Sequence, residues 1–98
     1  MKFTIEITEE AIEDMECLDK AACVTIIDAI ERQLVNQPLL ETRNRKPLRP
    51  DSQFGWELRI GKYRVFYDVN EGTVTVSVVA VGYKEHNQLY IRGQEVNL

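Results

Sequence analysis

The fold is decided by residues 56–69, which read WELRIGKYRVFYDV. Apolar and polar side chains alternate on both sides of the central Gly61-Lys62, and a period of two is typical of half-buried strands. A two-residue loop with glycine in its first position suits a type II′ turn, because that position needs a positive φ. The stretch therefore predicts a β-hairpin, around which the rest of the chain is arranged.

Two arginines, Arg59 and Arg64, lie on the predicted hairpin, one on each strand. Each could form an ion pair with a nearby acid, Glu57 or Asp68. Alternatively, the two guanidinium groups could face solvent together and bind an anionic ligand. The sequence alone leaves both alternatives open.

Length and composition describe one small domain that spans residues 1–98. The chain has 98 residues, of which 44% are apolar, and a chain of this size buries somewhat more than ~60% of its unfolded surface. No apolar run approaches the roughly 20 residues that span a bilayer, and the N-terminus alternates instead of forming an apolar signal segment. We expect a cytoplasmic protein with no membrane association.

The two cysteines, Cys17 and Cys23, have neither CxxC spacing nor a second cluster beside them. This pattern indicates reduced thiols and no disulfide framework. No group of His, Cys, Asp and Glu residues has the spacing of metal ligands, and no phosphate-binding glycine motif occurs. We therefore expect the protein to use no metal and no other cofactor.

The formal net charge of −4 hides an asymmetry between the two parts of the chain. Residues 1–41 hold ten acids and three bases, a net charge of −7, whereas residues 42–98 hold nine bases and six acids, a net charge of +3. We expect an acidic helical layer and a basic sheet edge. The overall acidity argues against a nucleic-acid partner, but the asymmetry keeps a polyanion-binding face compatible with the sequence.

The segment before the hairpin predicts a strand and two helices. Residues 2–7 alternate, which indicates a first strand. Thr8 and Asp19 are N-cap residues, and the apolar residues after each of them recur at helical spacing. The second helix is expected from residue 20 to about 37 and ends at Pro38, because the residue before a proline disfavours helical geometry.

The segment after the hairpin predicts a turn at residues 70–72 and a buried central strand in the β-branched run 73–81. We expect Gly82 to end this strand and Gly93 to end a short helix in the tail. The predicted class is α+β with the order β-α-α-β-β-β. Two antiparallel helices pack on a small, mainly antiparallel sheet, followed by a short C-terminal tail or helix.

Residues 38–53 contain three prolines and four cations and show no clean period. The cations are Arg43, Arg45, Lys46 and Arg49. The segment is either a solvated connection or a loop that contacts phosphates, because clustered basic residues bind polyanions by releasing counterions.

Lys84, His86 and Tyr90 follow the last predicted strand closely in the sequence. With the hairpin arginines they form a set suited to phosphodiester transfer, in which cations offset the developing charge and a proton donor and acceptor serve the reacting oxygens. Each residue also has a simpler interpretation. His86 could be a surface or hydrogen-bonding residue, Tyr90 could cover the edge of the core, and Lys84 could be a solvated charge.

Two motifs, YRVFYDV at residues 63–69 and VGYKE at 81–85, are followed by Tyr90. Together they resemble the RelE/ParE superfamily of toxins from bacterial type II toxin-antitoxin systems, and the resemblance covers nearly the whole chain. It implies a β-α-α-β-β-β fold and, in the RelE branch, a metal-independent endoribonuclease that cuts mRNA in the ribosomal A site. In that chemistry the ribose 2′-hydroxyl attacks the adjacent phosphate.

The resemblance also implies a role for each candidate residue. Arg64 matches the arginine that binds the scissile phosphate, and Lys84 matches the basic residue that stabilises the transition state. Tyr90 falls at the tyrosine that orients or deprotonates the nucleophile. Arg59 matches a further basic strand position, and His86 occupies a position from which it could act as a general acid. The remaining candidates for substrate binding are Lys62, Arg43, Arg45, Lys46 and Arg49.

The sequence departs from the ribonucleases of the superfamily in two ways. It has Trp56 and Glu57 where they usually carry lysines, and it is acidic where they are usually basic. The alternatives are a ParE-like poison of DNA gyrase and an inactive RelE-like binding domain. The presence of Arg64, Lys84 and Tyr90 together favours the ribosome-dependent endoribonuclease. The implied partners are a cognate antitoxin, with which the toxin could form a heterotetramer, and mRNA on the ribosome with rRNA contacts.

Overall fold

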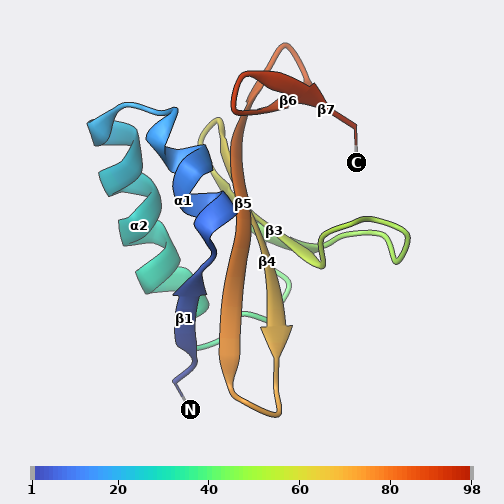
Figure 1. The fold of residues 1–98 in the computed structure, drawn as a ribbon. Coiled ribbons are helices and arrows are strands. Elements are labelled where there is room, and N and C mark those ends of the chain that lie inside the picture. The colour runs from blue at the N-terminus through green and yellow to red at the C-terminus, as the bar shows by residue number, and fades with distance from the viewer. Residues whose placement is uncertain (1, 98) are drawn as a thin grey trace.

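The computed structural model describes residues 2–97 and contains two helices against one face of a sheet (Figure 1). The sheet is mostly antiparallel, which confirms the predicted α+β class. The elements are β1 (Thr4–Ile7), α1 (Glu9–Glu16), α2 (Lys20–Leu34), β2 (Arg45–Pro47), β3 (Trp56–Ile60), β4 (Tyr63–Asn70), β5 (Thr75–Glu85), β6 (Gln88–Ile91) and β7 (Gln94–Val96). Neither helix in residues 2–97 is long and apolar enough to cross a membrane.

Both helices begin where the sequence predicts, because the capping side chains satisfy free backbone donors of the first turn. Thr8 Oγ1 accepts a hydrogen bond from the backbone N–H of Ala11 at 3.2 Å. Asp19 Oδ1 accepts one from the backbone N–H of Ala22 at 2.7 Å. α2 ends at Leu34, somewhat before its predicted end.

β5 is the central strand, and both of its edges are occupied. Along one edge it pairs antiparallel with β4. The other edge is shared, because residues 75–78 pair in parallel with β1 and residues 83–85 pair antiparallel with β6. The other strands follow in the order β2-β3-β4-β5-β6-β7. The 11 residues of β5 therefore join the two ends of the sheet.

Tight turns with positive φ connect the hairpin strands. In the two-residue loop between β3 and β4, Gly61 has a φ of +58° and Lys62 does not have a positive φ. This is the pattern predicted for a type II′ turn. In the loop between β5 and β6, His86 and Asn87 have φ values of 52° and 67°. Two successive positive values are the pattern of a type I′ turn.

The prediction for the C-terminal segment was wrong in two respects. β5 continues through Gly82 to Glu85, and β6 and β7 follow as a hairpin in place of a tail or helix. Gly82 is needed for another reason, because a Cβ there would collide with the carbonyl oxygen of Tyr90 on β6. The loop at residues 38–53 also contributes a strand, β2, which pairs with β3.

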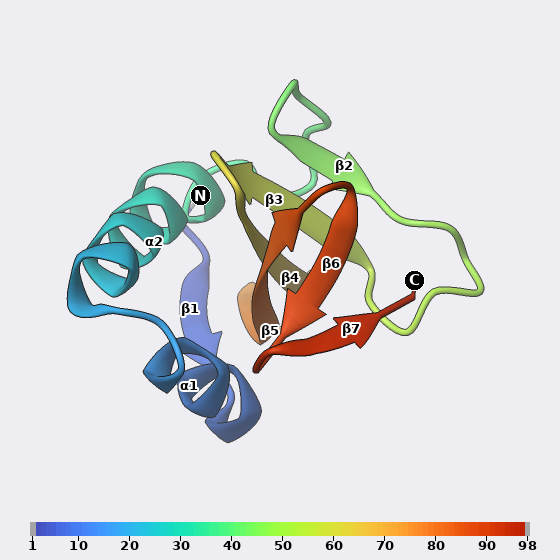
Figure 2. The ribbon, with the colours of Figure 1, turned by 90° about the horizontal axis from the view of Figure 1, so that it is seen from above.

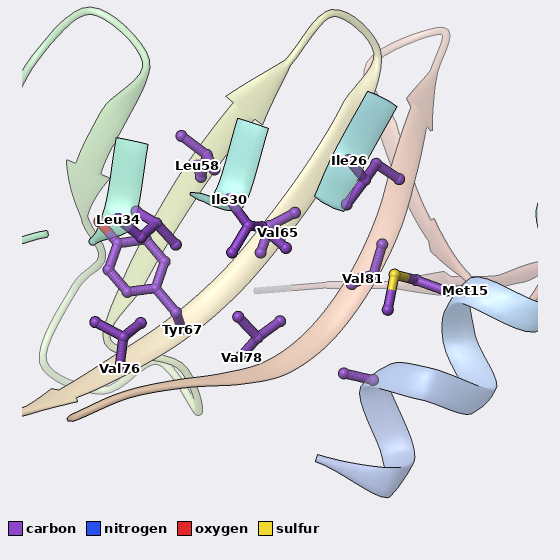
Figure 3. Packing of buried hydrophobic residues seen from close by; sticks show 11 residues of the cluster. Met15, Ile26, Ile30, Leu34, Leu58, Val65, Tyr67, Val76, Val78 and Val81 are labelled. Atoms are coloured by element: carbon purple, nitrogen blue, oxygen red, sulfur yellow. The ribbon is translucent and has the colours of Figure 1, made fainter. Parts of the chain in front are cut away.

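The main core lies between the helices and the sheet (Figure 3). Its buried members include Ile26, Ile30, Leu34, Leu58, Val65, Tyr67, Val76, Val78 and Val81. Tyr67 is the largest of them, and its hydroxyl donates a hydrogen bond to the carbonyl oxygen of Pro38 at 2.7 Å. Burial raises the pKa of Tyr67 well above its ordinary value of 10.0.

A smaller core covers the opposite face of the sheet. It consists of Phe66, Ala80 and Leu89, and the ring of Phe54 stacks on Phe66 with centroids 4.8 Å apart. β7 and the loop between β2 and β3 lie on this side, away from the helices (Figure 2). The pairing of β4 with β5 shifts after Phe66, which leaves Val79 as the extra residue of a β-bulge. Because both faces are covered, the central strand is apolar on both sides.

Asp14 connects α1 to the C-terminal strands, and its side chain is only 4% exposed. Its Oδ2 accepts a hydrogen bond from the backbone N–H of Val81 at 3.0 Å, and its Oδ1 accepts one from Arg92 Nε at 2.6 Å. Arg92 lies in the β6–β7 turn and also pairs with Glu13 at 3.0 Å. A buried carboxylate is tolerated only when it is paired in this way. Arg92 and Asp14 therefore fasten the β6–β7 hairpin to α1.

We expect Asp14→Ala to lower the free energy of unfolding by about 3 kcal/mol, because a buried ion pair and a backbone donor lose their partner. Glu13→Ala is the matched control. Glu13 pairs with the same arginine, but its side chain is 59% exposed, so its loss should cost less than about 1 kcal/mol. Urea unfolding followed by circular dichroism measures both values. Equal effects of the two substitutions would contradict the role of Asp14.

We expect Tyr67→Phe to lower the free energy of unfolding by about 1 kcal/mol at neutral pH, because the Pro38 carbonyl loses its donor. The difference from the wild type should shrink above pH ~10, where tyrosine in the unfolded chain ionises while burial keeps the folded phenol neutral. With a raised folded-state pKa, the stability that Tyr67 contributes is complete below the unfolded pKa and is lost as the pH rises. Urea unfolding of both proteins over a pH series tests this, and a pH-independent difference would rule it out.

Candidate functional site

Four charged residues gather on the face of the sheet away from the helices, near the β3–β4 turn. Glu57 and Arg59 alternate on β3, and Arg59 lies directly opposite Arg64 on β4. Arg64 lies opposite Gly82 on β5, and Lys84 follows further along the same face. Strand residues two apart share a face. Three adjacent strands thus bring three of the predicted cations together.

Glu57 is the centre of this cluster, and its side chain is only 7% exposed. Its Oε2 accepts a hydrogen bond from Arg59 Nε at 3.0 Å, and its Oε1 lies 3.9 Å from Arg64 Nε. Of the alternatives given by the sequence, an ion pair with Glu57 therefore applies to both arginines. Asp68 does not take part, since its Oδ1 accepts a hydrogen bond from the backbone N–H of Gly55 at 2.9 Å. From the sequence, Glu57 is named as an ion-pair partner of the two arginines but is not included among the site residues.

Arg64 is largely buried and holds the hairpin turn. Its side chain is 12% exposed, and Nη1 donates hydrogen bonds to the carbonyl oxygens of Gly61 at 2.7 Å and Tyr63 at 2.9 Å. Burial lowers the pKa of Arg64 from its ordinary value, and the charge of Glu57 opposes this effect. Arg64 thus stabilises the β3–β4 turn through its hydrogen bonds and the buried Glu57 carboxylate through its charge.

A hollow of about 310 Å³ opens beside the cluster. It is lined by Pro47, Leu48, Arg49, Ser52, Glu57, Arg59 and Lys84. The side chain of Arg59 is 40% exposed, in contrast to that of Arg64, which is not part of the lining. Three cations and one carboxylate give this cationic hollow a net positive charge. Such a site suits an anionic group such as a phosphate.

The other predicted cations point in different directions. Arg45 faces the helices, where its Nη1 donates a hydrogen bond to the carbonyl oxygen of Gln33 near the end of α2. Lys46 lies opposite Glu57 and therefore on the same face as the cationic hollow. Arg43 is exposed in the loop before β2. Lys62 occupies the β3–β4 turn and is exposed there.

Tyr90 lies on the other face of the sheet from the cationic hollow. It is the cross-strand partner of Tyr83, and the two rings stack with centroids 5.6 Å apart. Cross-strand partners point to the same side, and Tyr83 faces the α1–α2 connection on the helix side. His86 lies exposed in the β5–β6 turn. The structure therefore brings the three strand cations together but not Tyr90. Within residues 2–97, no three His, Cys, Asp or Glu side chains are grouped as metal ligands.

A family model described as the ParE toxin of the type II toxin-antitoxin system, parDE, matches residues 5–88. The chain belongs to the ParE toxin family. This confirms the resemblance of its motifs to the RelE/ParE superfamily and makes the protein the toxin of a type II toxin-antitoxin system. The match ends at the first residue of β6, so most of the β6–β7 hairpin of this toxin lies beyond it.

Solved structures of similar proteins share the fold of the toxin. The RelBE2 toxin-antitoxin complex from Mycobacterium tuberculosis matches with 25% identity and a TM-score of 0.75, covering 86% of this chain and 100% of that chain. The YoeB/ParE toxin from Agrobacterium tumefaciens matches with 20% identity and a TM-score of 0.67, covering 85% and 100%. The archaeal RelE-RelB complex from Pyrococcus horikoshii matches with 20% identity and a TM-score of 0.60, covering 88% and 99%. A search of curated proteins found no match.

We expect Arg64→Ala to lower the free energy of unfolding of the toxin by about 3 kcal/mol, because the buried Glu57 carboxylate loses a partner and the turn carbonyls lose their donor. Arg59→Ala is the comparison on the same carboxylate. Since Arg59 is more exposed, its loss should cost about 1.5 kcal/mol. Urea unfolding measures both. A larger loss of unfolding free energy in Arg59→Ala than in Arg64→Ala would show that Arg64 is not the main structural partner of Glu57.

Proposed function

We propose that this toxin inhibits translation as an endoribonuclease that cleaves mRNA on the ribosome. The observation that supports the proposal is the cationic hollow, where Arg59 and Lys84 from different strands meet the loop residue Arg49 at one opening. Basic side chains bind the backbone of a nucleic acid and release its counterions. An RNA phosphate is the anionic group that we assign to this hollow.

In the cleavage step, the ribose 2′-oxygen forms a bond to the adjacent phosphorus and the bond from phosphorus to the 5′-oxygen breaks. The 2′-hydroxyl loses a proton and the departing 5′-oxygen gains one. Negative charge builds up on the phosphoryl oxygens in the transition state, and fixed cations stabilise it. We assign this stabilisation to Arg59 and Lys84, with Arg64 acting through Glu57 as a positioning residue.

We assign proton transfer in this step to His86. This residue is exposed in the β5–β6 turn, two residues after Lys84. An imidazole has one nitrogen that can accept a proton and one that can donate a proton, as general acid–base catalysis requires. Tyr90 has no part in the step as proposed, because it lies on the helix side of the sheet.

A protein antitoxin is the partner that we propose for this chain. The solved complexes from Mycobacterium tuberculosis and Pyrococcus horikoshii that share its fold are toxin-antitoxin and RelE-RelB complexes. An antitoxin that covers the cationic hollow would keep RNA away from Arg59 and Lys84.

The double variant Arg59→Ala, Lys84→Ala should cleave ribosome-bound mRNA about 100-fold more slowly or worse, because removing even one stabilising donor costs about 10² to 10³ in rate. Purified toxin is incubated with translating ribosomes and the new 5′ ends of the mRNA are mapped. Arg32→Ala is the control, because this exposed arginine lies on α2, where it pairs with Asp28, and is outside the lining of the hollow. Cleavage at the wild-type rate by a folded double variant would contradict the assignment.

A second candidate is a poison of DNA gyrase without ribonuclease activity. It is favoured by the pairing of Glu57 with both strand arginines and by the description of the matching family as ParE toxins. Gyrase-dependent DNA breaks after expression of the toxin, with the mRNA left intact, would select this candidate and exclude the ribonuclease.

A further inference from the structure

The α1–α2 connection, the β3–β4 turn and the end of β5 lie near one another on the helix side of the sheet (Figure 1). Residues of these three segments line a second hollow. Its volume is about 240 Å³, and it is lined by Cys17, Leu18, Asp19, Ala22, Lys62, Tyr63, Tyr83 and Glu85. None of these residues lines the cationic hollow. We call this second site the tyrosine hollow.

Three tyrosines lie in register across three strands, and two of them, Tyr63 and Tyr83, line the tyrosine hollow. Tyr63 is opposite Tyr83, and Tyr83 is opposite Tyr90. The rings of Tyr83 and Tyr90 stack at 5.6 Å with an angle of 19° between their planes, and Lys62 Nζ lies 5.6 Å from the centre of the Tyr63 ring. All three tyrosines are only partly buried. A row of half-exposed rings at a hollow offers aromatic surface to a ligand.

Two carboxylates give the tyrosine hollow the opposite charge to the cationic hollow. Asp19 caps α2 through Oδ1, and its Oδ2 has no hydrogen-bond partner among residues 2–97. Glu85 is exposed and forms no ion pair with any residue in the same range. Lys62 is the single cation of the lining, so the two acids leave a net negative charge.

Size and charge together select the ligand. The volume lies below the ~300 to 1,000 Å³ of pockets for drug-sized molecules, which suits one side chain better than a nucleotide. The negative charge disfavours a phosphate group. Aromatic rings beside carboxylates favour a guanidinium, which stacks on a ring and donates several hydrogen bonds in its own plane.

We propose that the tyrosine hollow binds an arginine side chain presented by a basic segment of the antitoxin. The guanidinium stacks on the ring of Tyr83 and donates hydrogen bonds to Asp19 and Glu85. Charge complementarity supports this occupant, because residues 1–41, which include both helices, carry a net charge of −7. The assignment rests on the proposed antitoxin partner, but it requires no ribonuclease activity.

The experiment is an NMR titration of the ¹⁵N-labelled full chain with two short peptides, acetyl-Gly-Arg-Gly-amide and the same peptide with citrulline in place of arginine. Citrulline keeps the shape of the side chain and removes its charge. The arginine peptide should shift the amide signals of Lys62, Tyr83 and Glu85 in a saturable manner. The citrulline peptide should bind about tenfold more weakly, the loss expected for one charged contact.

Variants locate the binding within the hollow. Because Glu85 is exposed, Glu85→Gln leaves the core unchanged. It should weaken binding of the arginine peptide several-fold. Glu71→Gln is the matched control, because Glu71 is an exposed acid in the turn between β4 and β5. Tyr83→Leu keeps an apolar side chain and removes the ring, so it should weaken binding as well, with the NMR spectrum itself reporting that the variant is folded.

Three outcomes would overturn the proposal. They are equal binding of the citrulline peptide, an equal effect of Glu85→Gln and Glu71→Gln, and the absence of a saturable shift. A separate titration with adenosine distinguishes the other class of ligand, since shifts of the same signals by adenosine but not by the arginine peptide would make the tyrosine hollow a nucleobase site. Because cleavage of mRNA is measured separately with Arg59→Ala, Lys84→Ala, failure of one proposal leaves the other intact.

Discussion

The structure depends on β5, because this strand is paired along both edges and covered on both faces. β4 occupies one edge, while β1 and β6 share the other. A backbone buried in this way must satisfy every N–H and C=O within the protein. Between the β5 residues that pair with β1 and those that pair with β6, the N–H of Val81 donates to the carboxylate of Asp14 on α1. Asp14 on α1 thus satisfies a backbone donor of β5 and, through Arg92, also holds the β6–β7 hairpin.

Local sequence patterns were sufficient for the first hairpin and the two helices. Alternation, a glycine with positive φ and the caps Thr8 and Asp19 act over a few residues, so the sequence contains the whole signal. The C-terminal hairpin required information from further away. Gly82 was interpreted as a strand end, but its role is to let the backbone of Tyr90 approach, which only the folded chain reveals. Likewise, β2 forms by pairing with β3, which lies further along the chain. The three residues of β2 have no periodic pattern that would predict a strand.

The candidate site was predictable only in part, because local patterns fix the face of a strand residue but not its contacts with distant parts of the chain. Strand periodicity places Arg59 and Arg64 on one face, and the structure confirms this. Periodicity does not say which charged side chain becomes buried. The difference between the accessible Arg59 and the enclosed Arg64 depends on hydrogen bonds to the β3–β4 turn and on Glu57. For Tyr90, spacing after the last strand suggested proximity to Lys84, whereas the pairing of β5 with β6 puts the two side chains on opposite faces.

An acidic chain can carry a cationic hollow because the sheet separates its charges. Residues 1–41, which include both helices, hold ten of the 16 acids, whereas the cationic hollow is lined by residues of the later strands and the loop before β3. Exposed charges more than a Debye length of about 8 Å apart are largely screened at physiological salt. The charges that an RNA phosphate meets are therefore those of the lining, and the net charge of −4 has little influence there. The neighbours Lys84 and Glu85 illustrate this separation: successive strand residues point to opposite faces, so one lines the cationic hollow and the other the tyrosine hollow.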